Sequence, residues 1–160
     1  MNLKIGVLFF CLLMSSITWL SGQELSVLSY NIRYNSSGDG PDLWDLRKNE
    51  LIAQISTLQP THFGVQEATK TQMDDLTEGL PNYNFIGVGR DDGATQGEYS
   101  AIFYQKSALE VVTSGTFWLS PTPEVVSVGW DAALPRICTY AKFKHLSSAK
   151  TFWHFNTHYD

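Results

Sequence analysis

The stretch from Leu25 to Ile32, with the sequence LSVLSYNI, joins apolar and β-branched residues without a helical period, so it predicts a buried strand. Apolar residues then recur at helical spacing from Leu46 to Leu58, which predicts a helix that Pro60 ends. The short run from His62 to Gln66 (HFGVQ) predicts a second strand. A strand, a helix and another strand in this order are typical of the start of an α/β domain.

The rest of the chain adds one helix and then mostly strands. Residues 69–80 predict a short helix stopped by Pro81, with Met73, Leu76 and Leu80 on one face. Five later runs resemble strands: Tyr83–Val88, Ala101–Tyr104, Leu109–Phe117, Ile137–Phe143 and Thr151–Thr157. A β-α-β-α opening followed by strands predicts an α/β fold, built as a layered sandwich with a mixed sheet.

The N-terminus has the three-part layout of a secretory signal. A positive start ends at Lys4, Ile5–Met14 is an apolar run, and Ser15–Gly22 ends on small residues. The apolar run stops well before the roughly 20 residues that a spanning helix needs, so an uncleaved anchor is the less favoured alternative. We therefore predict a signal peptide at residues 1–22, no transmembrane anchor, and a secreted or periplasmic protein.

The charge balance is acidic. Cleavage after Gly22 would remove Lys4, leaving 10 of the 11 basic residues against 16 acidic ones, so the formal charge would change from −5 to −6. This balance gives no general attraction to phosphate backbones, although a local basic site could still bind nucleic acid. Of the two cysteines only Cys138 would remain, which excludes an intrachain disulfide within residues 23–160.

The last residues, TFWHFNTHYD at 151–160, form an apolar, strand-like run that leads into polar residues without a closing helix or turn. We therefore expect residues 23–160 to be the N-terminal part of one domain that is incomplete in this chain.

Polar side chains stand at the ends of three predicted strands: Asn31, Glu67 and His158. Ligands of α/β sheets bind beyond the carboxyl ends of strands, and a carboxylate with amide and water oxygens suits Mg²⁺. Each residue also has a structural alternative, because Asn31 could cap a turn, Glu67 could favour a helix dipole, and a lone histidine is often structural. His158 reaches the same end only if its strand runs parallel to the first.

Five short motifs occur in order along residues 23–160: LSYNIR at 28–33, GVQE at 64–67, GEYSAIFY at 97–104, PRICT at 135–139 and NTH at 156–158. With these motifs the chain resembles the endonuclease/exonuclease/phosphatase superfamily of metal-dependent hydrolases. The resemblance implies a four-layer α/β sandwich with mixed sheets and a site for Mg²⁺ or Mn²⁺.

The resemblance also implies roles for individual residues. Glu67 would be the main metal carboxylate, and Asn31 would lie beside it at the metal or the substrate phosphate. Arg136 would bind the phosphate, and the catalytic group would comprise His158, Glu98, which supports the histidine in part of the family, and Asp160. The alternatives are a solvated loop carboxylate for Glu98 and a surface ion pair for Arg136.

The family's later motifs, which supply a water-orienting aspartate and a general-base histidine, are not present in this sequence, so we expect this chain alone to be inactive.

The preferred hypothesis is an exported, divalent-metal-dependent phosphoesterase or phosphodiesterase. The alternative is a non-catalytic secreted binding domain on the same fold. The substrate could be a small phosphate ester, a lipid headgroup or a nucleic acid, and no stable protein partner is expected. Three tryptophans, Trp118, Trp130 and Trp153, are interpreted as packing residues rather than stacking platforms.

Overall fold

A computed structural model of the chain describes residues 25–159. The predicted signal peptide and Asp160 lie outside these residues. Within residues 25–159, no helix has the length and apolar character needed to cross a membrane.

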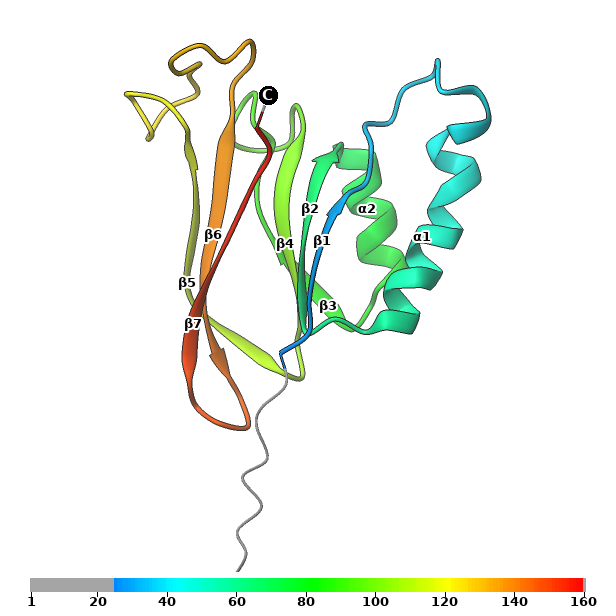
Figure 1. Ribbon diagram of the computed structural model, residues 1–160, viewed down its shortest axis with the longest axis vertical. Helices are drawn as coiled ribbons and strands as arrows, with labels where there is room; N and C mark the ends of the chain where they lie inside the picture. Colours follow the sequence, from blue (N-terminus) through cyan, green and yellow to red (C-terminus); the bar gives the residue numbers. More distant parts are fainter. Residues whose placement is uncertain (1–24, 160) are drawn as a thin grey trace, which may run out of the picture.

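The first sheet consists of four strands in the order β1-β2-β4-β3. They are β1 (Val27–Asn31), β2 (His62–Ala68), β3 (Tyr83–Ile86) and β4 (Tyr99–Gln105). β1 runs parallel to β2, whereas β4 is antiparallel to both β2 and β3, so the sheet is mixed. Because β1 and β2 are parallel neighbours, their carboxyl ends lie at the same edge, at the top of Figure 1.

Two helices cover one face of this sheet. A short 3-10 turn η1 (Gly40–Asp42) precedes α1 (Trp44–Leu58), and α2 (Lys70–Gly79) follows β2. α1 ends at Gln59, which adopts a left-handed conformation directly before Pro60, and Thr69 with Gln72 forms a capping box at the start of α2. Trp44, Leu51 and Ile55 of α1 and Met73 and Leu76 of α2 are buried against the sheet.

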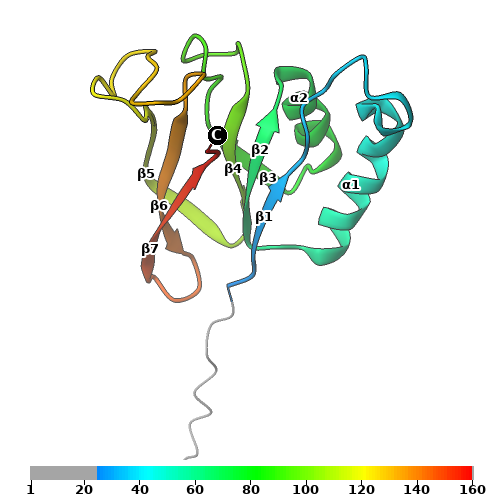
Figure 2. The same ribbon diagram turned by 45° about the horizontal axis from the view of Figure 1, so that its top comes forward.

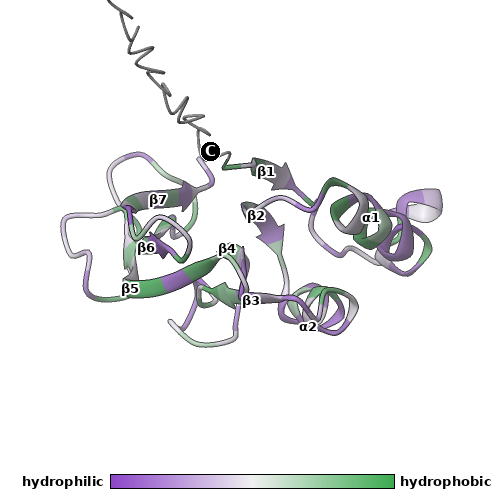
Figure 3. Cartoon of the chain, turned by 90° about the horizontal axis from the view of Figure 1, so that it is seen from below, coloured by the Kyte–Doolittle hydropathy of each residue, from purple (hydrophilic) through white to green (hydrophobic). Residues whose placement is uncertain are grey.

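The second sheet packs against the other face. It consists of three antiparallel strands in the order β5-β6-β7: β5 (Leu109–Trp118), β6 (Ile137–His145) and β7 (Thr151–Thr157). Viewed end-on in Figure 3, the helices lie on one side of the first sheet and β5, β6 and β7 on the other. Residues 25–159 thus form three layers of an α/β sandwich, which confirms the predicted fold class.

The two sheets are joined by an apolar cluster and by one buried polar side chain. Ile102 of β4 packs with Leu109, Ala141 and Phe143 of the second sheet. Asn156 of β7 is 5% exposed, and its amide donates to the backbone carbonyls of Val65 and Ala101 at 2.9 Å each. The Asn156 side chain therefore links β7 to both β2 and β4 of the first sheet.

Two details differ from the sequence-based expectations. β1 is half exposed rather than fully buried, because within the described residues it is an edge strand that pairs with β2 alone. The apolar face of α1 is also shifted: Leu46 and Leu58 are exposed, whereas Trp44 is buried and donates a hydrogen bond from its indole to Asp75. The predicted face of α2 is buried as expected.

Candidate active site

Three polar side chains meet where β1, β2 and β7 end. The Asn31 amide donates to Oε1 of Glu67 at 2.8 Å, and Nε2 of His158 lies 3.7 Å from the same oxygen. His158 Nε2 is also 3.4 Å from the Asn31 amide nitrogen. Glu67 and His158 are about a quarter to a third exposed, so solvent and ligands can reach the cluster.

Glu67 owes its position to an irregularity in β2. Its backbone is left-handed, with φ at 62°, and the pairing of β2 with β4 shifts register between Val65 and Ala68. A bulge of this kind re-aims a side chain, and a glutamate in this conformation is strained by about 1–3 kcal/mol. The sequence predicted Glu67 to follow the strand, whereas it lies inside β2 at the bulge.

The Glu67 carboxylate is held from two sides. Asn31 binds Oε1, and the backbone N–H of Tyr34 donates to Oε2 at 2.9 Å. Burial alone would raise the pKa of Glu67, but these hydrogen bonds, together with electrostatic interactions with His158 and Arg33, lower it below its ordinary value. Glu67 is therefore ionised at neutral pH and available to a cation.

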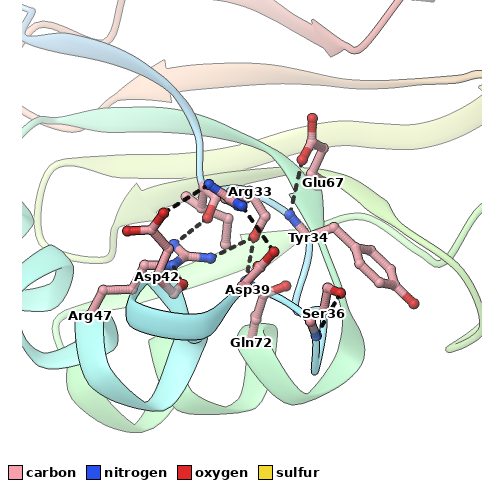
Figure 4. Close-up of polar contacts among 10 residues, drawn as sticks. Arg33, Tyr34, Ser36, Asp39, Asp42, Arg47, Glu67 and Gln72 are labelled. Atoms are coloured by element: carbon pink, nitrogen blue, oxygen red, sulfur yellow. Dashed lines mark hydrogen bonds and ion pairs between the residues drawn. The ribbon is translucent and has the colours of Figure 1, made fainter.

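The loop after β1 is braced so that Tyr34 keeps this orientation (Figure 4). Arg33 has a left-handed backbone and binds Asp39 and Asp42. From α1, the Arg47 guanidinium donates to the carbonyls of Ile32, Arg33 and Asp42, and Gln72 of α2 donates to the carbonyl of Arg33 at 2.8 Å. Both helices thus hold the backbone that carries Asn31 and Tyr34.

A second group of charged residues lies beside the first. Glu98, Arg136 and His158 line one small hollow of about 10 Å³, together with Arg90. Glu98 forms a two-pronged ion pair with Arg90, at 2.9 and 3.2 Å, and does not contact His158 directly. Nδ1 of His158 is buried and has no hydrogen-bond partner among the described residues. The hollow is about the size of one water molecule, which could join Nδ1 to the charged wall.

Five of the six candidate residues, Asn31, Glu67, Glu98, Arg136 and His158, therefore lie at one end of the molecule, and Asp160 lies outside the described residues. Their chemical roles stay predictions. The sequence assigned no role to the residues that hold them in place, namely Arg90, Arg47, Gln72 and Asn156. Two of these had a visible signal: Asn156 begins the motif NTH, and Arg90 begins the loop RDDGATQGE at 90–98, which ends with the opposite charge.

The donor set fits a hard cation better than a thiophilic or nitrogen-preferring one. The described residues contain no group of three or more His, Cys, Asp or Glu side chains that could hold a metal ion. One ionised carboxylate beside an amide matches Mg²⁺, which usually keeps several water molecules and binds only one or two protein carboxylates.

Comparisons with known proteins bear on the family and the fold of the chain. No sequence-family model matches the chain. An uncharacterized protein L388 of Acanthamoeba polyphaga mimivirus is 32% identical over 124 residues, which cover 73% of this chain and 46% of that protein.

Solved structures give more detailed matches. An endonuclease/exonuclease/phosphatase family protein from Bacteroides thetaiotaomicron superposes with a TM-score of 0.83 at 44% identity, covering 85% of this chain and 50% of that one. A mannosyl-6-phosphatase from the same organism matches with a TM-score of 0.83 and 44% identity, over 84% and 51% of the two chains.

The catalytic domain of human Nocturnin shares the fold, with a TM-score of 0.67 at 16% identity over 85% of this chain and 49% of that one. The chain spans about half the length of the proteins it matches. The ordered motifs, the two packed sheets and the matches at 43–44% identity to two Bacteroides structures place this chain in the endonuclease/exonuclease/phosphatase family.

Proposed function

We propose that the protein is a divalent-metal-dependent phosphoesterase that acts outside the cytoplasm. The observation that carries this proposal is the ionised Glu67 carboxylate, held by Asn31 and Tyr34, with His158 at 3.7 Å and Arg136 in the adjoining hollow. Export is supported only by the layout of residues 1–22.

The position of each side chain supports a role in hydrolysis. Glu67 would hold Mg²⁺ or Mn²⁺, which when bound neutralises phosphate charge. Asn31 keeps the Glu67 carboxylate oriented and offers its own amide to a phosphate oxygen. Arg136 can bind a phosphate oxygen through its guanidinium. His158 stands where it can donate a hydrogen bond or a proton to the leaving oxygen.

The family relatives narrow the substrate to a phosphate ester. Of the substrates left open by the sequence, the likeness to a mannosyl-6-phosphatase favours a phosphomonoester of a small molecule over a phosphodiester. The acidic composition also disfavours long nucleic acids, which need clustered cations.

The test is a metal titration of hydrolysis with the full-length protein and the variant Glu67→Gln. The amide keeps the shape of the side chain but lacks the charge that holds the cation, so we expect phosphate-ester hydrolysis to fall by at least about a hundredfold. Mn²⁺ affinity, measured by calorimetry, should weaken in parallel. Glu78→Gln, at an exposed position of α2, is the matched control and should leave both quantities unchanged.

Hydrolysis that survives complete chelation, or wild-type activity in Glu67→Gln, would refute the proposal. A well-folded full-length protein that binds phosphate esters but hydrolyses none would favour the alternative, a non-catalytic binding domain.

A further inference from the structure

The segment between β5 and β6, residues 119–136, exposes several apolar side chains. It lies at the same end of the molecule as the candidate active site (Figures 1 and 2). Trp130 is 77% exposed, Tyr159 beside the described C-terminus is 71% exposed, and Val125, Val128 and Leu134 are also exposed. A large exposed aromatic side chain at the same end as the candidate active site is a candidate contact for a ligand. The sequence-based interpretation of Trp130 as a packing residue is therefore wrong, whereas Trp118 is buried as expected.

A hollow of about 180 Å³ opens beside Trp130, with Leu119, Asp131, Arg136 and Tyr159 in its walls. Arg136 also lines the small hollow that contains Glu98 and His158. Arg136 therefore lies between the two hollows, so a ligand in the larger one can contact the guanidinium that also lines the smaller one. The larger hollow is below the range of about 300–1,000 Å³ that drug-sized ligands occupy, so it suits a single ring.

The Trp130 side chain is presented by a fixed backbone. Its φ is 53°, a left-handed conformation that is a rare outlier for a bulky residue. Gly129 packs so closely that a Cβ there would lie 2.3 Å from the carbonyl oxygen of Leu119, and a hydroxyl contact of 2.6 Å joins Ser120 to Ser127. Strain and an exposed tryptophan in an otherwise braced loop are both costs to folding, and such costs gather at ligand sites.

We propose that this hollow, the Trp130 subsite, binds the sugar ring of a phosphorylated carbohydrate whose phosphate lies at Arg136 and His158. A pyranose ring has an apolar face that can lie on the indole, and hydroxyl groups that can donate to the Asp131 carboxylate. A negative charge in the wall opposes a ligand with a second phosphate, which disfavours a polynucleotide or a nucleoside diphosphate. This inference rests on the proposed phosphoesterase function, because it assigns the leaving group of that reaction.

The test compares three esters on the full-length enzyme: mannose 6-phosphate, the acyclic glycerol 2-phosphate and adenosine 5′-monophosphate. Trp130→Ala should raise KM for mannose 6-phosphate by roughly tenfold, with kcat little changed, because a ring contact made equally in the ground and transition states is lost. KM for glycerol 2-phosphate should stay the same, and Trp130→Phe should recover most of the loss. Trp153→Ala is the matched control, since Trp153 is exposed on the outer face of β7 and contacts Tyr140 and Phe155 there.

Equal changes of KM for the cyclic and acyclic esters, or the same effect in Trp153→Ala, would overturn the subsite and leave the phosphoesterase function intact. A larger effect on the adenosine ester than on the sugar ester would overturn the carbohydrate assignment. If none of the esters is hydrolysed with Mg²⁺ or Mn²⁺, the proposed function fails, and calorimetric binding of mannose 6-phosphate then decides the subsite. Binding that Trp130→Ala abolishes supports the subsite; no binding, or equal binding by the variant, overturns it.

Discussion

Histidines lie at both ends of the contact between β2 and β7, and the environments at the two ends differ. At the end away from the site, His62 of β2 is 3% exposed and its ring centre lies 4.8 Å from that of His154 of β7, with Phe143 and Phe152 nearby. Nδ1 of His62 and Nδ1 of His154 have no hydrogen-bond partner among the described residues. At the other end, His158 lies beside the Glu67 carboxylate.

The difference shows that the neighbours of a histidine, rather than its residue type, determine what it can do. Burial, and to a lesser extent the charge of His154, lower the pKa of His62 to about 4, so this ring stays neutral and serves packing. His158 has a carboxylate within reach and is partly open to solvent. Asn156 lies between the two ends and fixes the alignment of both.

The largest expected effect is on kcat, and it should distinguish His158 from His154. His158→Ala should lower kcat for phosphate-ester hydrolysis by about 10²–10⁴-fold, the usual contribution of a positioned acid or base. The affinity for Mg²⁺ or Mn²⁺ should stay nearly unchanged, because we assign His158 to the phosphate rather than to the ion. His154→Ala, at the other end of the same strand, should leave kcat within a few-fold of the wild type. Comparable losses in the two variants would break the comparison.

A substitution of Asn156 tests whether this side chain fixes β7 against β2. Asn156→Leu removes the hydrogen bonds that the buried carbonyls of Val65 and Ala101 accept from this side chain, and it leaves the Gln66 amide with Ser29 as its remaining partner. We expect the free energy of unfolding to fall by about 3–5 kcal/mol in urea titrations, because each unsatisfied buried group costs about 1–3 kcal/mol. Asn84→Leu, on an exposed part of β3, should cost far less. A stability loss of similar size at both positions would mean that Asn156 is not the link between the sheets.

A substitution on β2 tests the same contact between β2 and β7. A Cβ added at Gly64 of β2 would lie 2.6 Å from Oδ1 of Asn156, so the two strands would have to separate slightly. Gly64→Ala should therefore destabilise the fold by about 1–3 kcal/mol, the usual cost of overpacking. Gly38→Ala, where the nearest atom lies at 3.6 Å, is the control. Combining Gly64→Ala with Asn156→Ala should cost less than the sum of the single changes, because the smaller side chain relieves the contact.

The sequence predicted the fold well because its signals are local. Helical spacing, the prolines after each helix and the apolar strand runs were enough to find both α-helices and all seven strands of residues 25–159 within a few residues. The errors arose where packing overrides local pattern. Leu46 fits the helical period but is exposed, while Trp44 takes the buried position because its indole finds Asp75 across to α2.

The candidate site was predictable only as a set of residues. Motif order indicated Asn31, Glu67, Glu98, Arg136 and His158, but the distances between them depend on strand pairing that sequence spacing does not encode. The bulge that turns Glu67 toward Asn31 and the pairing of Glu98 with Arg90 are tertiary features. The exposure of Trp130 was missed for the same reason, since an apolar residue in a loop has no period to place it.

The smallest expected effect concerns the pH dependence of stability at the end away from the site. The folded-state pKa of His62 is about 4 and its ordinary value is 6.5, so the unfolded chain binds the proton more readily at intermediate pH. This residue's contribution is therefore complete above pH 6.5 and is lost progressively as the pH falls toward 4. Between pH 7 and pH 5.5 the loss should be about 1 kcal/mol in the free energy of unfolding. His62→Phe keeps an aromatic ring against Phe143 and Phe152 but cannot titrate, so urea titrations at the two pH values should give a smaller difference for the variant than for the wild type.

The control is His145→Phe, which replaces a partly exposed histidine at the end of β6 and should retain the wild-type difference. If His62→Phe also keeps that difference, the acid sensitivity lies elsewhere, and the contrast between the packing histidine His62 and the candidate catalytic residue His158 would lose its physical basis.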